Sequence, residues 1–595
     1  MEGDSQKRLS DNYEPPGKGE IFSKEFSIDE SSYDYANDTS IAPRTKKNIF
    51  VRAFDSFREP EDVKDYSHLS KQDKALIFLS RTTPKLSRRH LMVIAASSCV
   101  GTGLFIGSGS SLKLGGPAAL LIGFGLMSIS LVCIMSTIGE ISVRYPTLSP
   151  FYELPSRFLD PSLGFAIGWI YAFCWMVTIP LELIAGATLT QFWRNDNNSA
   201  AKVNPVAWVA LLWAFDAAIN LAGSRVYGEL EFVVGAIKIT AVFGWILFSL
   251  INVCGGPPTN HYLGGYNFTH PKAFTHSFKG VIQVLVSCAF AFGGTEVSGI
   301  AAAETANPVK AIPSAVKQVF WRVLVFFIII VFFVGLMVLS DTDGLGNSDS
   351  GAGSPFVLAL SLTGVKALPS IFNAVIICSV IGVSNAAIYA SSRTLTAMAV
   401  KGAAPPFLCY IDRQGRPLYS LLVVIAFSLL CFVCASTEYN TVFNWLYAFA
   451  ALAFLFAWSA VCVVYVRIRH AFKVRDRSLD ELVYRSPVGI PGAIIGGGIP
   501  FAVLCLQFWI YLFPIGGKPD ASYFFQGDLS IPVFIGLFIG HKIVYWKSSR
   551  WVRTSEIDID SGVREIDLDH LREMQEEERR NASKNPFKRL GRFLC

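Results

Sequence analysis

The feature that most constrains this chain is a series of long apolar segments separated by short polar loops. Most of them are as long as the ~20 residues that a helix needs to cross the hydrocarbon core of a bilayer. The segments lie at 90–110, 117–138, 163–193, 206–223, 229–253, 280–302, 321–340, 367–399, 418–436, 443–466, 491–514 and 529–546. Only 16% of the residues are charged, against about 25% in soluble proteins. The pattern predicts an all-α integral membrane protein with twelve transmembrane helices.

The loop charges indicate which way the predicted helices are oriented. The loops on one side are rich in Lys and Arg, for example Arg144, Lys317, Arg416 and Arg475, whereas the loops on the other side carry few such residues. Positive charge marks the cytosolic side, and an even number of spans puts both termini there. We therefore expect a cytosolic tail over 1–88, a twelve-helix domain over 89–548 and a cytosolic tail over 549–595.

Both tails are polar and are expected to serve regulation. Residues 1–88 are rich in Ser, Asp, Glu and Lys without a helical period, which is typical of disorder. Their lysines either accept ubiquitin from a ubiquitin-ligase machinery or are only solvated: Lys7, Lys18, Lys24, Lys46 and Lys47. The C-terminal tail mixes acidic and basic residues and is expected to dock on the inner loops or to act in regulation. Its last residue, Cys595, is a candidate for palmitoylation.

Several classes of function lack their parts in this sequence. Most cysteines lie inside apolar runs, where they are expected as buried small hydrophobes, and neither metal spacing nor a catalytic constellation is visible. The net charge of +6 forms no basic stripe, so nucleic acid is not an expected partner. No Walker A motif is present, so an ion gradient would have to drive uphill transport. We expect a membrane carrier in contact with lipid, without cofactor, metal or enzymatic activity.

A glycine pair interrupts the first apolar segment, in Cys99-Val100-Gly101-Thr102-Gly103. Glycine disfavours continuous helix, so the backbone can open here. The N–H groups at the start of the half-helix that follows would then lie at a positive dipole end, which suits a carboxylate. The alternative is close helix packing through small residues, which is common in membranes.

A second break in the sixth segment favours the first interpretation. Phe290-Ala291-Phe292-Gly293-Gly294-Thr295-Glu296 combines two glycines with an ionisable side chain, which inside a membrane is functional by default. Its distance of five spans from the first break matches two inverted five-helix repeats, with two extra helices at the end. Together the breaks predict a substrate site in which exposed carbonyls receive an ammonium group. Phe290 and Phe292 would close over the solute as an aromatic gate.

Four further ionisable residues lie within or at the ends of the apolar segments. Lys238 can lose its proton when desolvated, and its charge can replace the Na⁺ of other transporters; alternatively it extends to the interface. Glu182 follows Pro180-Leu181 and is expected near the substrate or the proton. Glu140 and Asp216 are expected to form structural pairs or to lie at helix ends.

The motifs around these residues resemble the fungal amino-acid permeases of the amino acid–polyamine–organocation superfamily, in particular the general amino-acid permease branch. The resemblance runs from about Arg88 to the end of the chain. The matching stretches are Arg88–Leu91, Gly101–Gly109, Gly115–Pro117, Gly139–Glu140, Phe292–Glu296, Asn307–Pro308, Lys310–Pro313, Lys317–Arg322, Asn373–Ala374, Ser391–Thr394, Val442–Leu446, Asp558–Asp560, Asp567–Asp569 and Phe593–Cys595.

The resemblance implies the twelve-helix inverted-repeat fold and proton-coupled amino-acid uptake at the plasma membrane. Gly101, Thr102 and Gly103 would bind the substrate carboxylate. Carbonyls near Cys99, Phe290 and Gly293 would bind the ammonium group, and Thr295 would also belong to the substrate site. Phe290 would act as the gate. Lys238 matches a lysine of the fifth span that is implicated in proton coupling, and Glu296 matches an acid associated with coupling or substrate. Glu182 is the further candidate for a proton role.

The tenth segment departs from the resemblance and bears on the substrate. Tyr447–Ala451 is apolar apart from its tyrosine, where relatives commonly carry small polar residues. We therefore expect neutral amino acids over a broad range, while a cationic substrate would need Glu182 or Glu296. Two rival functions share the fold: an amino-acid sensor with little transport, and a carrier of polyamines or quaternary amines. The second would have no carboxylate for the Gly101–Gly103 amides.

Overall fold

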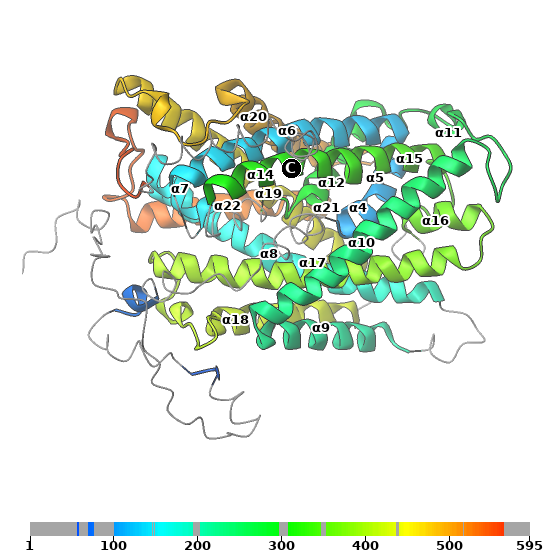
Figure 1. The fold of residues 1–595 in the computed structure, drawn as a ribbon, viewed down its shortest axis with the longest axis horizontal. Coiled ribbons are helices and arrows are strands. Elements are labelled where there is room, and N and C mark those ends of the chain that lie inside the picture. The colour runs from blue at the N-terminus through cyan, green and yellow to red at the C-terminus, as the bar shows by residue number, and fades with distance from the viewer. Residues whose placement is uncertain are drawn as a thin grey trace, which may run out of the picture.

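The computed structural model describes residues 56–58, 70–75, 100–145, 147, 149–193, 203–296, 308–346, 353–435, 439–515 and 517–563. Throughout these ranges the regular elements are helices, many of which run side by side along the long axis of the molecule (Figure 1). Their bounds are α4 Thr102–Phe105, α5 Gly107–Gly115, α6 Pro117–Arg144, α7 Pro150–Phe158, α8 Pro161–Thr190, η3 Gln191–Trp193, α9 Pro205–Ala222, α10 Ser224–Val253, α11 Tyr266–Thr269, α12 Ser277–Phe292, α14 Pro308–Val323, η5 Leu324–Ile329, α15 Ile330–Met337, α16 Pro355–Leu362, α17 Leu368–Val400, η7 Pro406–Cys409, α18 Leu418–Ser428, η8 Leu429–Ala435, α19 Tyr439–Val474, η9 Leu479–Glu481, α20 Gly489–Leu512, α21 Ala521–Asp528, α22 Ser530–Val544 and η10 Thr554–Glu556.

The membrane fold predicted from the apolar segments is confirmed. Within the described residues, nine helices are long and apolar enough to cross a membrane, and the pair α21–α22, bent by 68°, makes a tenth if it is one span. The first and sixth predicted segments are only partly covered, since 76–99 and 297–307 lie outside the described residues. The count of twelve, the inverted repeat and the division into three parts remain predictions.

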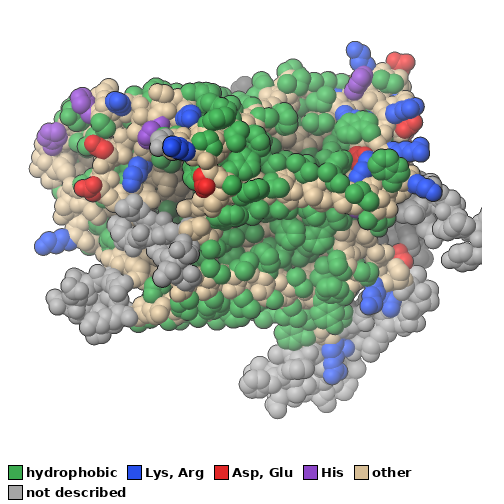
Figure 2. Space-filling model, turned by 180° about the vertical axis from the view of Figure 1, so that it is seen from behind, with side chains coloured by type: hydrophobic (Ala, Val, Ile, Leu, Met, Phe, Trp, Pro, Cys, Tyr) green, Lys and Arg blue, Asp and Glu red, His purple; other side chains and the backbone are tan. Residues whose placement is uncertain are grey.

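An apolar belt surrounds the bundle between two polar ends. In Figure 2 hydrophobic side chains cover the middle of the visible face, while charged side chains and histidines gather at its two ends. Large apolar side chains point outward from several helices, among them Leu211, Leu247, Phe501 and Ile543, which are 59–67% exposed. Such a surface would be unstable in water but is the expected boundary with lipid tails.

The helix α8 lies at the centre of the bundle and packs against α7, α9, α17, α19 and α22. Asp160 caps its first turn by accepting the Ser162 N–H at 2.8 Å, and it pairs with Lys542 of α22. Burial opposes ionisation of Asp160, but the hydrogen bonds from Lys542, Ser549 and the Ser162 N–H outweigh it and lower its pKa. The cap therefore ties the last span to the central helix.

Glu140, expected as a structural residue, forms a buried ion pair. Its carboxylate accepts Arg469 Nη2 of α19 at 2.7 Å, the Tyr465 hydroxyl at 3.0 Å and the Ser486 N–H at 2.7 Å. The pair joins the end of α6 to the end of α19. A buried carboxylate is tolerable only with such a complete set of donors.

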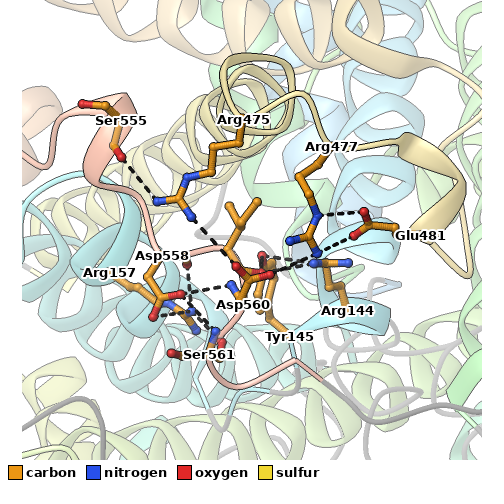
Figure 3. Close-up of polar contacts among 11 residues, drawn as sticks. Arg144, Tyr145, Arg157, Arg475, Arg477, Glu481, Ser555, Asp558, Asp560 and Ser561 are labelled. Carbon is orange, nitrogen blue, oxygen red and sulfur yellow. Dashed lines mark hydrogen bonds and ion pairs between the residues drawn. The ribbon is translucent and has the colours of Figure 1, made fainter.

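The first part of the C-terminal tail, 551–563, docks on the helix ends that surround it (Figure 3). Arg144 Nη2 and the Tyr145 hydroxyl donate to the Ile559 carbonyl at 3.1 and 2.9 Å, and Arg157 Nη2 donates to the Asp558 carbonyl at 2.9 Å. Arg477 pairs with Asp560 at 3.2 Å. We call this end of the molecule the tail side. The expected docking of this tail is observed for 551–563, while 564–595 lie outside the described residues.

Two acidic groups at the tail side are held ionised. The fork of hydrogen bonds from Arg477 lowers the pKa of Glu481. For Asp558 burial acts in the opposite direction, but hydrogen bonds from Ser561 and the Asp560 N–H outweigh it and lower its pKa. Docking of the segment thus rests on paired charges at neutral pH.

Replacing Ile559 by Ala should loosen the docked segment. Ile559 is fully buried, and removing three carbons of a buried isoleucine costs about 2 to 5 kcal/mol. We expect faster protease cleavage within 551–563 in the purified protein. The matched control is Ile543→Ala, a change of the same size at a side chain that is 67% exposed. Equal cleavage rates in the two variants would contradict the expectation.

Candidate functional site

In the described part of the first segment, helix begins directly after the first glycine of the predicted break. Gly101 has an extended backbone, with φ −141° and ψ −153°, and α4 begins at the next residue without a side-chain cap. The first helical bond joins the Phe105 N–H to the Gly101 carbonyl at 3.0 Å. The N–H groups of the first turn of a helix have no acceptor within that helix. Residues before Val100, including Cys99, lie outside the described part of the chain.

In the sixth segment, helix α12 stops at the predicted glycine break. The helix α12 stops at Phe292, and Gly293 leaves helical geometry with φ −54° and ψ 142°. Gly294 follows at φ +89°, in the left-handed region that favours glycine. The C-terminal end of α12 carries partial negative charge, and the N-terminal end of α4 carries partial positive charge. These two ends lie together because α4 and α12 pack against each other.

The glycines allow backbone and rings to approach closely. A Cβ atom on Gly103 would lie 2.5 Å from the Cα of Ala291, which is backbone of α12. On Gly101 it would lie 2.7 Å from Val383 Cγ2, and on Gly293 2.3 Å from a ring carbon of Phe454. No side chain fits at these three positions without displacing a neighbour.

A small cavity of about 20 Å³ lies between the two breaks. Its aromatic walls are Trp175, Phe290 and Phe454, all of which are buried. A volume of this size holds about one water molecule, so the walls must move apart before an amino acid fits between them. The residues around it are Gly101, Gly103, Trp175, Thr178, Glu182, Phe290, Ala291, Gly293, Val383 and Phe454.

Glu182 links the cavity to the first break. Its Oε1 accepts the Thr102 hydroxyl at 2.6 Å, and it is the one ionisable group among the described residues around the cavity. Its second oxygen, Oε2, accepts no hydrogen bond from the described residues. The carboxyl is 1% exposed, so a polar solute in the cavity would be its natural partner.

Thr295 and Glu296 are fully buried but are not among the described residues around the cavity. The Tyr171 hydroxyl donates to Glu296 Oε1 at 3.4 Å, and the Tyr171 ring packs edge-on against Phe454 at 6.4 Å. Glu296 therefore lies behind the aromatic wall of the cavity, one layer from the space that a solute would occupy.

Lys238 lies outside the cavity wall, on the face of α10 that packs against α17. Its Nζ is 3.0 Å from the position that a Cβ of Gly382 would take, and Glu231 Oε2 is 3.1 Å from the same point. Lys238 is 1% exposed, so it does not extend to the surface. Its positive charge acts on the carboxyl of Glu182.

The two phenylalanines proposed as a gate separate in the structure. Phe290 faces the cavity and stacks at a tilt on Tyr447, with ring centroids 4.6 Å apart. Phe292 packs instead against Phe327 at 4.3 Å and Phe124 at 5.7 Å, in an aromatic cluster. Of the two, Phe290 together with Tyr447 is placed to cover the cavity.

Several site residues were missed from the sequence. Trp175 and Thr178 precede Glu182 by two turns and one turn of α8, a spacing that places all three on one helix face. Glu231 and Lys238 share a face of α10 in the same way. No local pattern indicates Val383 or Phe454, because they reach the cavity only through the packing of α17 and α19 on α8.

A multi-span helical bundle with a cavity between the start of α4 and the end of α12 has the arrangement of a membrane transport protein. Comparison with known families agrees: this chain belongs to the amino acid permease family, whose model matches residues 90–553. The resemblance seen in the motifs is thereby confirmed, and an enzyme is not indicated, because the similar proteins are transporters.

Similar proteins differ in the substrate that their names give. A general amino-acid permease of Candida albicans, GAP2, is 41% identical over 94% of this chain and 98% of its own length. The cationic amino acid transporter 1 of Schizosaccharomyces pombe is 40% identical over 96% and 94%. The S-adenosylmethionine permease GAP4 of Candida albicans is 38% identical over 91% and 89%. Family membership therefore does not determine the substrate.

Proposed function

We propose that this protein is a proton-coupled permease that imports amino acids across the plasma membrane by alternating access, with neutral amino acids preferred over a broad range. The observation that carries this proposal is that the start of α4 and the end of α12 lie at one small cavity. A positive and a negative helix end side by side are complementary to a zwitterion.

The backbone provides the recognition of the substrate's charged ends. The carboxylate accepts hydrogen bonds from the N–H groups at Gly101, Thr102 and Gly103, and the ammonium group donates to carbonyls near Phe290 and Gly293. The missing side chains of the three glycines let the two helix ends and the cavity walls pack closely around these groups. A polyamine or quaternary amine would leave the α4 amides without a partner, which disfavours such carriers.

The walls of the cavity favour a neutral side chain. Trp175, Val383, Phe290 and Phe454 offer apolar surface, and Thr178 adds a hydroxyl. Glu182 is held by Thr102 and is close to the charge of Lys238, so it is a poor free counter-ion for a cationic side chain. A cationic substrate would have to compete with both contacts.

Proton coupling is assigned to Lys238, Glu182 and Glu296. All three are at most 1% exposed, and a buried charge is stable only when paired or neutralised. Binding of a zwitterion at Glu182 changes the electrostatic potential at Lys238, and a change in the charge of Lys238 in turn changes the affinity for the zwitterion. Loss or gain of a proton in this group would therefore favour one orientation of the broken spans over the other.

The topology proposed from the loop charges is supported by the tail side. Arg144, Arg157, Arg467, Arg475 and Arg477 cluster there, as the cytosolic side of a membrane protein would predict. We place both termini in the cytosol on this basis. The tail lysines proposed as ubiquitin acceptors lie outside the described residues, and so does Cys595.

The function is tested by uptake of a panel of labelled amino acids in cells that lack their own permeases. We expect concentrative uptake of neutral amino acids that increases at acid pH and collapses with a protonophore. Uptake that is unchanged by the protonophore would overturn the proposed proton coupling. Uptake of cationic amino acids alone would overturn the proposed preference for neutral amino acids. Binding without uptake would indicate an amino-acid sensor instead.

A further inference from the structure

Another buried carboxyl group, Asp216 of α9, lies in a polar cluster with Asn220 and Asn385. Asn385 Nδ2 of α17 donates to Asp216 Oδ1 at 2.6 Å, and Asn220 Nδ2 donates to Asn385 Oδ1 at 2.7 Å. Asn220 also donates to the Asp216 carbonyl at 2.9 Å. Asp216 is 1% exposed, so amide groups and not water surround it.

The charges of this region do not balance if every group is ionised. Glu182, Asp216 and Glu231 are three carboxyls beside the single ammonium of Lys238, and all four side chains are at most 1% exposed. The carboxyls interact in pairs, Glu182 with Asp216 and Asp216 with Glu231. Two unneutralised negative charges at this depth would cost several kcal/mol each. The cluster must therefore hold protons, or a proton and the ammonium group of a substrate.

The helix positions order these groups along the membrane normal. The chain turns at Gly223 between α9 and α10, and these helices meet at their ends nearer the tail side (Figure 1). At ~1.5 Å per residue, Asp216 and Glu231 lie about 10 Å from this turn and Lys238 lies about 20 Å from it. Asp216 and Glu231 thus stand between Lys238 and the tail side.

We propose that Asp216 is a proton-binding group of the transport cycle, which receives the proton that Lys238 releases by way of Glu231. In the first step an N–H bond of the Lys238 ammonium breaks and an O–H bond forms on the Glu231 carboxylate, leaving an amine and a carboxylic acid. In the second step that O–H bond breaks and one forms on Asp216, restoring the Glu231 carboxylate. The total charge is unchanged and no further reactant is needed.

The groups that face Asp216 come from each of its main packing neighbours. Glu231 acts on it from α10, Glu182 from α8 and the Cys431 thiol from η8, while Ser384 and Asn385 contact it from α17. None of the titratable groups among them is cationic, so nothing in this set holds Asp216 permanently ionised. A carboxyl in such surroundings can exchange a proton as Glu231 and Lys238 change state.

This inference rests on the proposed proton coupling, and the test separates the two. The variant Asp216→Asn keeps the size of the side chain and the acceptor for Asn385. In proteoliposomes we expect amino-acid counterflow at the wild-type rate, while the accumulation ratio under a pH gradient falls to one. The matched control, Asp528→Asn, removes the fully buried carboxyl of α21 and should accumulate as the wild type does.

The outcomes are distinguishable. A wild type without accumulation driven by the pH gradient overturns the proposed coupling and this inference with it. A coupled wild type whose Asp216→Asn variant accumulates equally well overturns the role of Asp216 alone. If Asp216→Asn lacks counterflow as well, the pair Asp216→Glu and Asp216→Gln decides. The two have equal size, and only the first should accumulate; equal behaviour of the pair contradicts the proposal.

Discussion

Replacing Lys238 by Met is expected to abolish accumulation of amino acid against a gradient while leaving binding and counterflow intact. Lys238 is buried, lies outside the cavity wall and acts on Glu182 through its charge. Methionine keeps most of the volume but cannot carry a proton. The measurement is labelled uptake under a pH gradient beside counterflow at equal pH. Accumulation should fall to the equilibrium ratio.

The control for this prediction is Lys366→Met, the same change at an exposed loop lysine. It should behave as the wild type in both assays. Unchanged uphill uptake in Lys238→Met would remove this lysine from the mechanism. Loss of counterflow together with uptake would show instead that its charge is needed to hold Glu182 and Thr102 in place.

Replacing Gly103 by Ala is expected to reduce uptake by roughly a hundredfold or more, because misplacing a binding group by an ångström has effects of that size. The added Cβ would lie 2.5 Å from the Ala291 Cα, and backbone cannot rotate away. The start of α4 and the end of α12 must then separate, which moves both groups proposed to hold the zwitterion. Uptake per molecule at the cell surface measures the effect.

A neighbouring glycine gives a graded comparison. A Cβ on Gly101 meets the Val383 side chain at 2.7 Å, so Gly101→Ala should be milder, and Val383→Ala should restore part of its activity. The same second change should not rescue Gly103→Ala, whose conflict is with backbone. Equal rescue of both variants would contradict this assignment of the contacts.

The apolar segments predicted the helices well because hydropathy is summed over a whole span, but they did not predict the ends. The tenth segment was expected to stop at 466, whereas α19 continues to Val474. Its extra turns carry arginines that are held by other segments, such as Arg469 by Glu140 and Arg467 by the Val552 carbonyl. Partners so distant in sequence leave no local pattern. The 68° bend between α21 and α22 was not predicted either.

The site could be predicted where its signal is local. The glycine breaks follow from backbone preference, and Glu182 and Lys238 stand out as charges in apolar runs. Glu231 was missed because the expected span began at 229. This placed Glu231 at the end of a span, where charged residues are common. The helix begins at Ser224, which places Glu231 two turns inside it. Val383 and Phe454 depend on how α17 and α19 pack on α8, which no single segment encodes.

The glycine contacts between α4 and α12 have a consequence for how this family diversifies. If backbone groups hold the carboxylate and the ammonium, substitutions outside the close-packed glycines leave that recognition in place. The capacity to bind an α-amino acid is then inherited unchanged, while the walls formed by Trp175, Thr178, Val383 and Phe454 are free to vary. New substrate ranges would arise by single replacements in those walls, without passing through inactive ancestors.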